Sequence, residues 1–255
     1  MAWQSEGESA GVPFSISAWA ASAAGLIDAQ HWLDWARDPI LPMTPGVAPE
    51  LAWMPALARR RVGPLGRHAL HVANECTRGT EALPIVFASR YGDAERSLDL
   101  LGTLVAGEPV SPTAFGLSVH NAVAAQFSIT RSQRSPSVSI AAGAASAAAG
   151  IFEAAAMLAD GATEVVLVCY DAPLPGDYAV FSDEPPALWA WAWRMTPPRT
   201  DQPCFSLRTA PGAGPDTVSG LPFGLELLRL ALNESGAPVR RRIDGVTWTL
   251  EPSRG

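Results

Sequence analysis

"PSVSIAAGAASAAAGI", residues 136–151, decides the fold of this chain, because it joins a short apolar strand directly to an alanine-rich helix. The pattern predicts a strand over 136–142 and a helix from Ala144 to about Leu158, whose small residues allow close packing against a neighbour. Junctions of this kind often carry a nucleophile at the turn. Only alanine, glycine and serine stand there, so the expected reactive side chain is missing.

Strands and helices alternate on both sides of this junction. The continuous apolar run EVVLVCYD at 164–171 is typical of a strand covered on both faces. Before the junction the sequence predicts strands at 13–20 and 83–89, helices around 27–35, 62–76, 92–106 and 116–129, and a proline-rich irregular stretch at 38–55. This alternation predicts an α/β fold built in layers.

The last third of the chain has a different texture. LWAWAWRM at 188–195 alternates tryptophan with small residues, which predicts a strand with Trp189, Trp191 and Trp193 on one face, in a core or an interface. Strands are also predicted in CFSLRT and VTWTL, with a helix over 221–235 between them. We therefore expect one domain over 1–175 and an extension over 176–255 that completes or caps it.

Composition narrows the function. The chain has 255 residues, 48% of them hydrophobic, and a net charge of -7, which argues against nucleic acid or an anionic membrane as a partner. No apolar run reaches the roughly 18 residues of a membrane span, and the polar N-terminus is unlike a signal peptide. Three widely spaced cysteines indicate neither a disulfide framework nor a zinc site. We expect a cytoplasmic protein without metal or cofactor.

Four stretches, in this order, resemble a β-ketoacyl synthase of the thiolase-like fold. They are LPIVFASRYGD at 83–93, SPTAFGLSVHNAVAAQFSI at 111–129, SPSVSIAAGAASAAAG at 135–150 and DGATEVVLVCYD at 160–171. The resemblance covers roughly residues 11–175. It implies a layered α/β/α fold that is truncated and lacks most of the second ketosynthase half.

The resemblance also identifies the missing side chain. In ketosynthases a cysteine stands at the start of the buried helix, where free N–H groups and the helix dipole stabilise a thiolate and a developing oxyanion. Laid on that pattern without gaps, the cysteine position is Ala144. The family also needs two histidines from its second half, and the last histidine of this sequence is His120. The resemblance therefore implies a chain that is not itself an enzyme.

As a ketosynthase-like chain without the catalytic residues, this chain resembles the chain-length factors. It also resembles the small ketosynthase-like subunits of aryl polyene and related polyene or polyketide pathways. The resemblance implies a heterodimer with an active β-ketoacyl synthase, which would receive acyl chains from an acyl carrier protein. The segment like SPTAFGLSVHNAV lies at the two-fold interface of ketosynthase dimers and contributes to the partner's acyl tunnel. The tunnel or interface candidates are Ala114, Phe115, Ser118, Val119 and Ala122, with Asn121 as a structural hydrogen bonder.

An alternative is a stand-alone serine-dependent acyltransferase or hydrolase on the same fold. Ser118 with His120 as base, or Ser146 as a substitute nucleophile, would carry it. Helix residues two apart point in different directions, which disfavours the first pair. Ser146 lies about half a turn from the position of Ala144, which favours a packing role. A third possibility is a scaffold that has no effect on product length.

Overall fold

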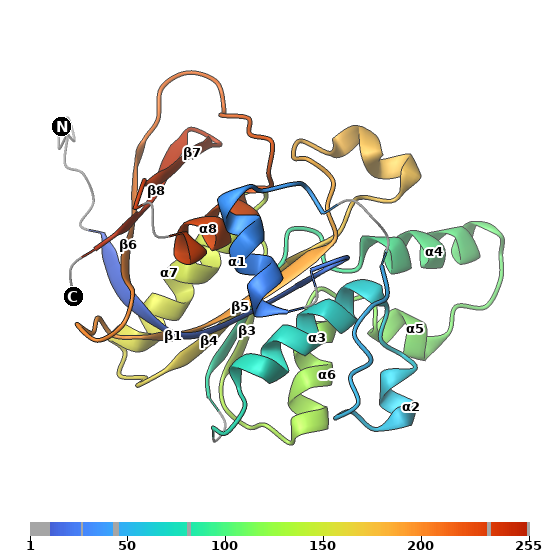
Figure 1. Ribbon diagram of the computed structural model, residues 1–255. Coiled ribbons are helices and arrows are strands. Elements are labelled where there is room, and N and C mark those ends of the chain that lie inside the picture. The colour runs from blue at the N-terminus through green and yellow to red at the C-terminus, as the bar shows by residue number, and fades with distance from the viewer. Residues whose placement is uncertain (1–10, 27, 43–45, 81–82, 234–235, 254–255) are drawn as a thin grey trace, which may run out of the picture.

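The computed structural model describes residues 11–26, 28–42, 46–80, 83–233 and 236–253. Its centre is a mixed sheet of eight described strands in the order β3-β2-β4-β5-β1-β6-β8-β7 (Figure 1). The strands are β1 (Val12–Ala23), β2 (Ile85–Ala88), β3 (Ser137–Ile140), β4 (Val165–Asp171), β5 (Trp189–Thr196), β6 (Cys204–Pro211), β7 (Val239–Ile243) and β8 (Val246–Pro252).

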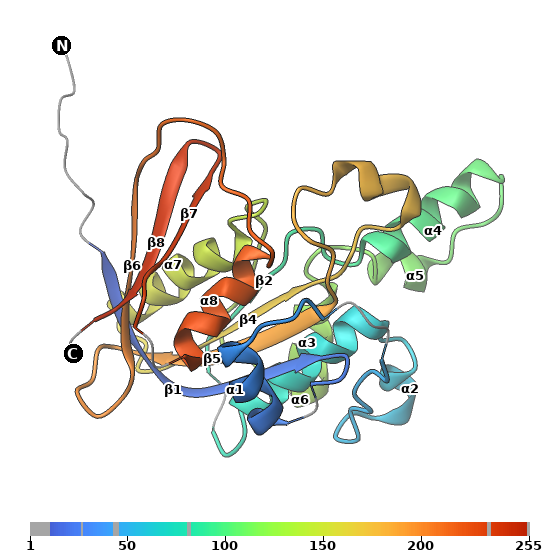
Figure 2. The same cartoon turned by 45° about the horizontal axis from the view of Figure 1, so that its top comes forward.

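Helices cover both faces of this sheet (Figures 1 and 2). One apolar cluster joins the sheet to α1, α7 and α8, and a second joins its other face to α3 and α6. The helices are α1 (Ala29–Arg37), α2 (Ala56–Arg59), α3 (Pro64–Cys76), α4 (Ala94–Val105), α5 (Pro112–Gly116), α6 (Ala122–Arg131), α7 (Ser146–Ala159), the 3-10 helix η1 (Gly176–Phe181) and α8 (Phe223–Leu232). This arrangement confirms the predicted α/β/α fold.

The tryptophan strand β5 runs through the middle of the sheet, antiparallel to both β4 and β1. Trp189, Trp191 and Trp193 all face the cluster under α7 and α8, while the intervening alanines face α3, as the two-residue period predicts. The Trp191 indole N–H donates to the Gly224 carbonyl at 2.9 Å. A methyl on Gly224 would lie 2.3 Å from the Trp189 ring, so α8 lies directly on this strand.

The strands after residue 175 hydrogen-bond into the same sheet as those before it. On β8, Trp248 makes an edge contact with Phe152 of α7, their ring centroids 5.8 Å apart. The predicted domain boundary at residue 175 stays a prediction. No helix among the described residues is both long and apolar enough to cross a membrane.

The predicted helix over 116–129 is wrong in its first part. A separate short helix, α5, ends at Gly116, and the chain then turns until α6 begins at Ala122. Ser111 caps α5 by accepting from the Ala114 N–H at 3.3 Å, and Pro112 fills the first helical position. These two residues start a helix of their own. The predictions for Ile27 and for 234–235 lie outside the described residues.

Candidate functional site

The candidate site is the junction between β3 and α7. The chain leaves β3 at Ile140 and reverses around Gly143, whose φ of 55° is in the left-handed region that glycine adopts easily. The Ala145 N–H donates to the Ala142 carbonyl at 3.0 Å, and the Ser146 N–H to the Gly143 carbonyl at 3.1 Å. Ala144 is half-buried at this turn, and its side chain packs against the core beside α7. The predicted strand, turn and helix are therefore present, and the side chain at position 144 is a methyl group.

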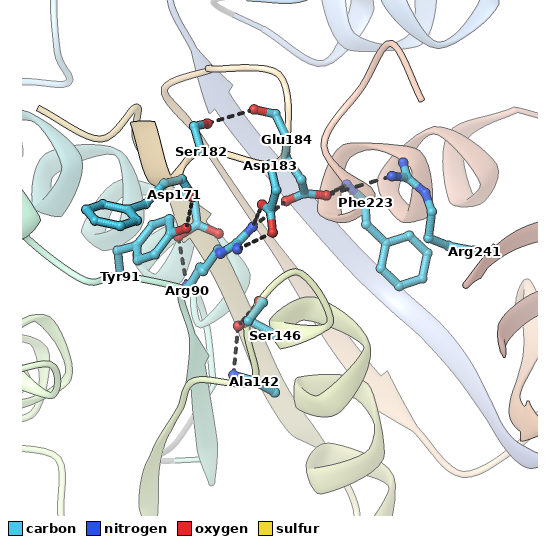
Figure 3. A network of polar contacts seen from close by, with 12 residues as sticks. Arg90, Tyr91, Ala142, Ser146, Asp171, Ser182, Asp183, Glu184, Phe223 and Arg241 are labelled. Carbon is cyan, nitrogen blue, oxygen red and sulfur yellow. Dashed lines mark hydrogen bonds and ion pairs between the residues drawn. The ribbon is translucent and has the colours of Figure 1, made fainter. Parts of the chain in front are cut away.

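Ser146 fastens this turn (Figure 3). Its hydroxyl donates to the Gly143 carbonyl at 2.7 Å and accepts from the Ala142 N–H at 2.9 Å, and the residue is 3% exposed. A nucleophilic serine needs a free approach and a base that takes its proton. Ser146 has committed its proton to a carbonyl, which cannot act as a base.

The alanine and glycine residues of α7 serve close packing on the sheet. A methyl group on Gly150 would lie 2.7 Å from Leu167 Cδ1 of β4 and 2.9 Å from the Ala88 Cβ of β2. Side-chain carbon atoms do not approach so closely in proteins, so α7 can pack at this distance from the sheet only because position 150 is glycine. The small residues therefore let α7 pack directly on β2 and β4.

Ser118 and His120 are not arranged as a nucleophile and its base. The Ser118 hydroxyl donates to the Phe115 carbonyl at 2.8 Å. The Nε2 of His120 lies 2.8 Å from the Ser89 carbonyl oxygen, an acceptor, so this nitrogen carries the proton. The two side chains therefore bond to different carbonyls, that of Phe115 within α5 and that of Ser89 directly after β2.

The predicted interface residues separate into exposed and buried ones. Phe115 is 62% and Val119 43% exposed, while Ala114 is half-buried. Ala122, by contrast, is only 7% exposed because it begins the inner face of α6. Asn121 stands at the N-cap of α6, but its side chain makes no capping hydrogen bond. Of these five residues, Phe115 and Val119 present the most apolar surface to a partner.

Exposed apolar side chains gather on one side of the molecule. Among the described residues fourteen large hydrophobic side chains are exposed, and nine of them lie on α4, α5, η1 and the adjoining turns. α4 has no buried residue at all. Figures 1 and 2 show α4, α5 and η1 at the same end of the molecule. We call these nine the apolar surface: Tyr91, Leu101, Leu104, Val105, Phe115, Val119, Tyr178, Val180 and Phe181.

Strand β3 is an unpaired edge of the sheet. It pairs in parallel with β2 on one side and with no described strand on the other. Its sequence, SVSI, carries no charge or proline, and Ser137 is exposed while the next three residues are half-buried. An edge strand of this kind offers a row of free N–H and C=O groups to another chain.

A polar network closes the carboxyl ends of β2 and β4 (Figure 3). Asp171 Oδ1 accepts from the Ser89 hydroxyl at 3.0 Å and from the Arg90 N–H at 2.8 Å. Burial raises the pKa of the Asp171 carboxyl to about 7, against the lowering effect of these two hydrogen bonds. The Arg90 guanidinium forms a bidentate ion pair with Asp183. Ser89 and Asp171 lie 82 positions apart in the chain, and Arg90 and Asp183 lie 93 apart, so no sequence pattern indicated these pairs.

The network continues to α8 and β7. Glu184 Oε1 accepts from the Phe223 N–H at 2.8 Å, at the start of α8. Arg241 of β7, 5% exposed in its side chain, donates through Nε at 3.0 Å and Nη2 at 2.5 Å to Glu226 Oε2. It also donates to the Leu221 carbonyl at 3.0 Å. These contacts join α8, β7 and the segment before β5.

Two cavities among the described residues lie away from the junction. A cavity of about 30 Å³ above β2 and β4 is lined by Arg90, Asp171 and Glu184, among others, and has room for about one water molecule. Another of about 460 Å³ lies between α8 and β7. Ala144 lines neither of them, so neither cavity provides room for an acyl chain at the junction.

A family model described as β-ketoacyl synthase, N-terminal domain, matches residues 32–242. The ketosynthase ApeO in complex with its chain length factor ApeC from Xenorhabdus doucetiae contains a similar chain, with 26% identity and a TM-score of 0.81. That match covers 93% of this chain and 98% of the other, so the two have nearly the same length. No curated protein sequence matches.

Two more distant structures share the fold. The ishigamide ketosynthase/chain length factor is 17% identical with a TM-score of 0.55, and the match covers 79% of this chain and 68% of that one. A ketosynthase from module 6 of the bacillaene synthase from Bacillus subtilis 168 is 11% identical with a TM-score of 0.57. The second match covers 80% of this chain but 42% of the other.

Proposed function

This chain belongs to the β-ketoacyl synthase family, and from that premise we propose that it is a non-catalytic subunit of the chain-length-factor type. It pairs with an active β-ketoacyl synthase, which supplies the cysteine and histidines and performs the condensation. The acyl carrier protein delivers its substrates to that partner, so it meets this chain only indirectly. The product is an elongated acyl chain of the polyene, polyketide or fatty-acyl type.

Ala144 carries this proposal. A methyl group occupies the turn at the start of α7, where the family's nucleophile would stand, and a methyl group cannot be acylated. The nearest hydroxyl, on Ser146, holds the turn closed through two hydrogen bonds. The junction therefore retains a structural role without its chemistry.

The surface supports pairing with another chain. Obligate interfaces are large and relatively apolar, commonly on the order of 2,000 Å² or more. The apolar surface and the unpaired edge of β3 offer the two kinds of contact such an interface uses, which are side-chain burial and backbone hydrogen bonds. The similar chain from Xenorhabdus doucetiae belongs to a complex of a ketosynthase with its chain length factor.

We assign the tunnel-shaping role to Ala114, Phe115 and Val119. Phe115 is exposed on α5 and Val119 on the turn that follows it, where a partner would cover them. Residues 176–255 complete the same domain, since they supply four strands of the sheet. We place the complex in the cytoplasm, and the three buried free thiols at Cys76, Cys169 and Cys204 fit a reducing compartment.

The test is coexpression with the full-length ketosynthase encoded nearest to this chain's gene. We expect a 1:1 complex in size-exclusion chromatography with light scattering, and condensation of acyl and malonyl units carried by the acyl carrier protein. Replacing the partner's cysteine with alanine should abolish condensation, whereas Ser118→Ala and Ser146→Ala should each leave it intact. A stable monomer that ignores the ketosynthase would refute the proposal.

Product length tests the tunnel. Ala114→Phe and Val119→Phe should shorten the acyl products of the complex, because each adds volume where the partner's chain would grow. Val47→Phe, at a residue 96% exposed and outside the apolar surface, is the matched control. If both variants leave the product distribution unchanged while the complex still forms, the chain is a scaffold.

A further inference from the structure

The segment between β4 and β5, residues 172–188, leaves the carboxyl end of β4, forms η1 at the same end of the molecule as α4, and returns to β5 (Figures 1 and 2). We call it the strap. Its helix has no buried residue, and Val180 and Phe181 are 79% and 65% exposed. Burial in the core begins only at Ala187, next to β5. Apolar packing within this chain therefore does not determine where the helix of the strap lies.

Arg90 holds the strap instead. Its guanidinium, 14% exposed, forms the bidentate pair with Asp183, with Nη2 2.7 Å from Oδ2, and lies 3.8 Å from Glu184 Oε2. The same group lies over the Tyr91 ring, 4.7 Å from its centroid. Partly buried bidentate pairs fix geometry better than exposed single contacts do. The backbone of Arg90 is held in turn, because its main-chain N–H donates to the Asp171 carboxylate at the end of β4.

The strap is also held on either side of this pair. The Tyr91 hydroxyl donates to the Phe181 carbonyl at 3.5 Å, and the Tyr178 and Phe181 rings contact each other with centroids 6.1 Å apart. Beyond Asp183, the Glu184 carboxylate accepts from the Phe223 N–H of α8. The ring contact lies within η1 itself, so the contacts that anchor the strap to the rest of the chain are polar, and they leave Val180 and Phe181 exposed.

We propose that the strap is part of the surface that meets the ketosynthase partner, and that Arg90 is the positioning residue that presents Phe181 and Val180 to it. This inference rests on the proposed function. An apolar ledge held in place before binding loses little conformational freedom when a partner covers it. Val180 and Phe181 are part of the apolar surface, together with Tyr91 and the exposed side chains of α4, so one partner can cover them all.

Phe181→Ser and Arg90→Met test the two halves of the proposal. Each should weaken the complex with the coexpressed ketosynthase by about tenfold or more, the first by removing a central apolar contact and the second by releasing the strap. Asp183→Asn removes the charge on the exposed side of the pair and should act like Arg90→Met. Arg90→Lys keeps a charge but not the two-pronged geometry, and should recover part of the affinity.

Two matched controls make the same kinds of substitution outside the strap, so that the effect of the location can be told from that of the substitution itself. Val218→Ser changes a valine that is 86% exposed in the loop between β6 and α8. Arg199→Met breaks an arginine–aspartate pair with Asp201 in the turn between β5 and β6, whose side chains are 55% and 65% exposed. Both controls should bind the ketosynthase as the unaltered chain does. Weakening by either control to the same extent would overturn the assignment.

A double-mutant cycle distinguishes positioning from general stability. Because Arg90 acts through Phe181, the Arg90→Met/Phe181→Ser chain should bind little worse than Phe181→Ser alone. Additive losses, or normal binding by both single variants, would overturn the inference. If Leu104→Ser and Val105→Ser weaken the complex while the strap variants do not, the proposed function stands and the strap is excluded from the interface. If the unaltered chain does not bind, both proposals fall.

Discussion

Replacing Asp171 with asparagine should remove a pH dependence from the stability of the fold. Burial raises the pKa of this carboxyl from 3.8 to about 7 in the folded chain. Because the folded chain favours the protonated carboxyl, this group's contribution to the free energy of unfolding is complete below about pH 4. The contribution declines as the pH rises and is lost above about pH 7. Asparagine keeps an oxygen for the Ser89 hydroxyl and the Arg90 N–H, but it cannot ionise.

The size of the effect follows from the shift. About three pKa units correspond to about 4 kcal/mol at 1.36 kcal/mol per unit, and partial solvent exposure reduces this, so about 2 kcal/mol is expected. His68 works in the opposite direction, because burial lowers its pKa to about 4 and protonation then destabilises the fold as the pH falls. Both chains contain His68, so its effect cancels in the difference between them.

Urea unfolding between about pH 5 and about pH 8 measures this difference. About two of the three pKa units fall within that range, so relative to the unaltered chain Asp171→Asn should gain about 1 kcal/mol in free energy of unfolding from its lower to its upper end. Asp99→Asn, at an exposed aspartate of α4, is the control and should show no such trend. If the free energies of unfolding of Asp171→Asn and of the unaltered chain change in parallel with pH, the Asp171 carboxyl is ionised throughout this range and its pKa is not raised to about 7.

Three further predictions concern the junction and the charged pair. Ala144→Cys should place a thiol at the start of α7 that iodoacetamide alkylates in the native state. The variant alone should not condense acyl chains, and condensation without a partner would refute the proposal that this chain is non-catalytic. Gly150→Ala should lower the free energy of unfolding by about 2 kcal/mol through its clash with Leu167, and an unchanged denaturation midpoint would show that the helix can shift. Arg241→Met should cost about 3 kcal/mol by leaving the Glu226 carboxylate unpaired, and a fully stable variant in thermal denaturation would contradict that.

Local patterns predicted the elements with a strong period. The alternation in 188–195 placed three tryptophans on one face of β5, and the continuous apolar run gave β4 at 165–171. Strand β7, VRRRI, was missed because three successive arginines hide the two-residue period. One of them, Arg241, points inward only because Glu226 of α8 meets it there. Such long-range pairing has no local signal.

The candidate site was predictable in part for the same reason. The strand, turn and helix around Ala144 are contiguous in the sequence, so their pattern and the resemblance to a family located them together. Arg90 and the strap are neighbours in the fold but distant in the sequence, since Arg90 and its ion-pair partner Asp183 lie 93 positions apart. Only the structure shows that Asp183 meets Arg90 and that Phe181 stays exposed beside it.

The central position of β5 has a consequence for how this protein is made. β1 begins at Val12, yet its register partners lie in β5 and β6, so that Ser15 faces Thr196. A ribosome adding roughly 5 to 20 residues per second leaves the first strand without its neighbours for roughly ten to forty seconds. During that interval β1 has neither of its neighbours, whereas β4 already has β2 to pair with. Chaperones that hold nascent chains should therefore matter more for this protein than its modest size suggests.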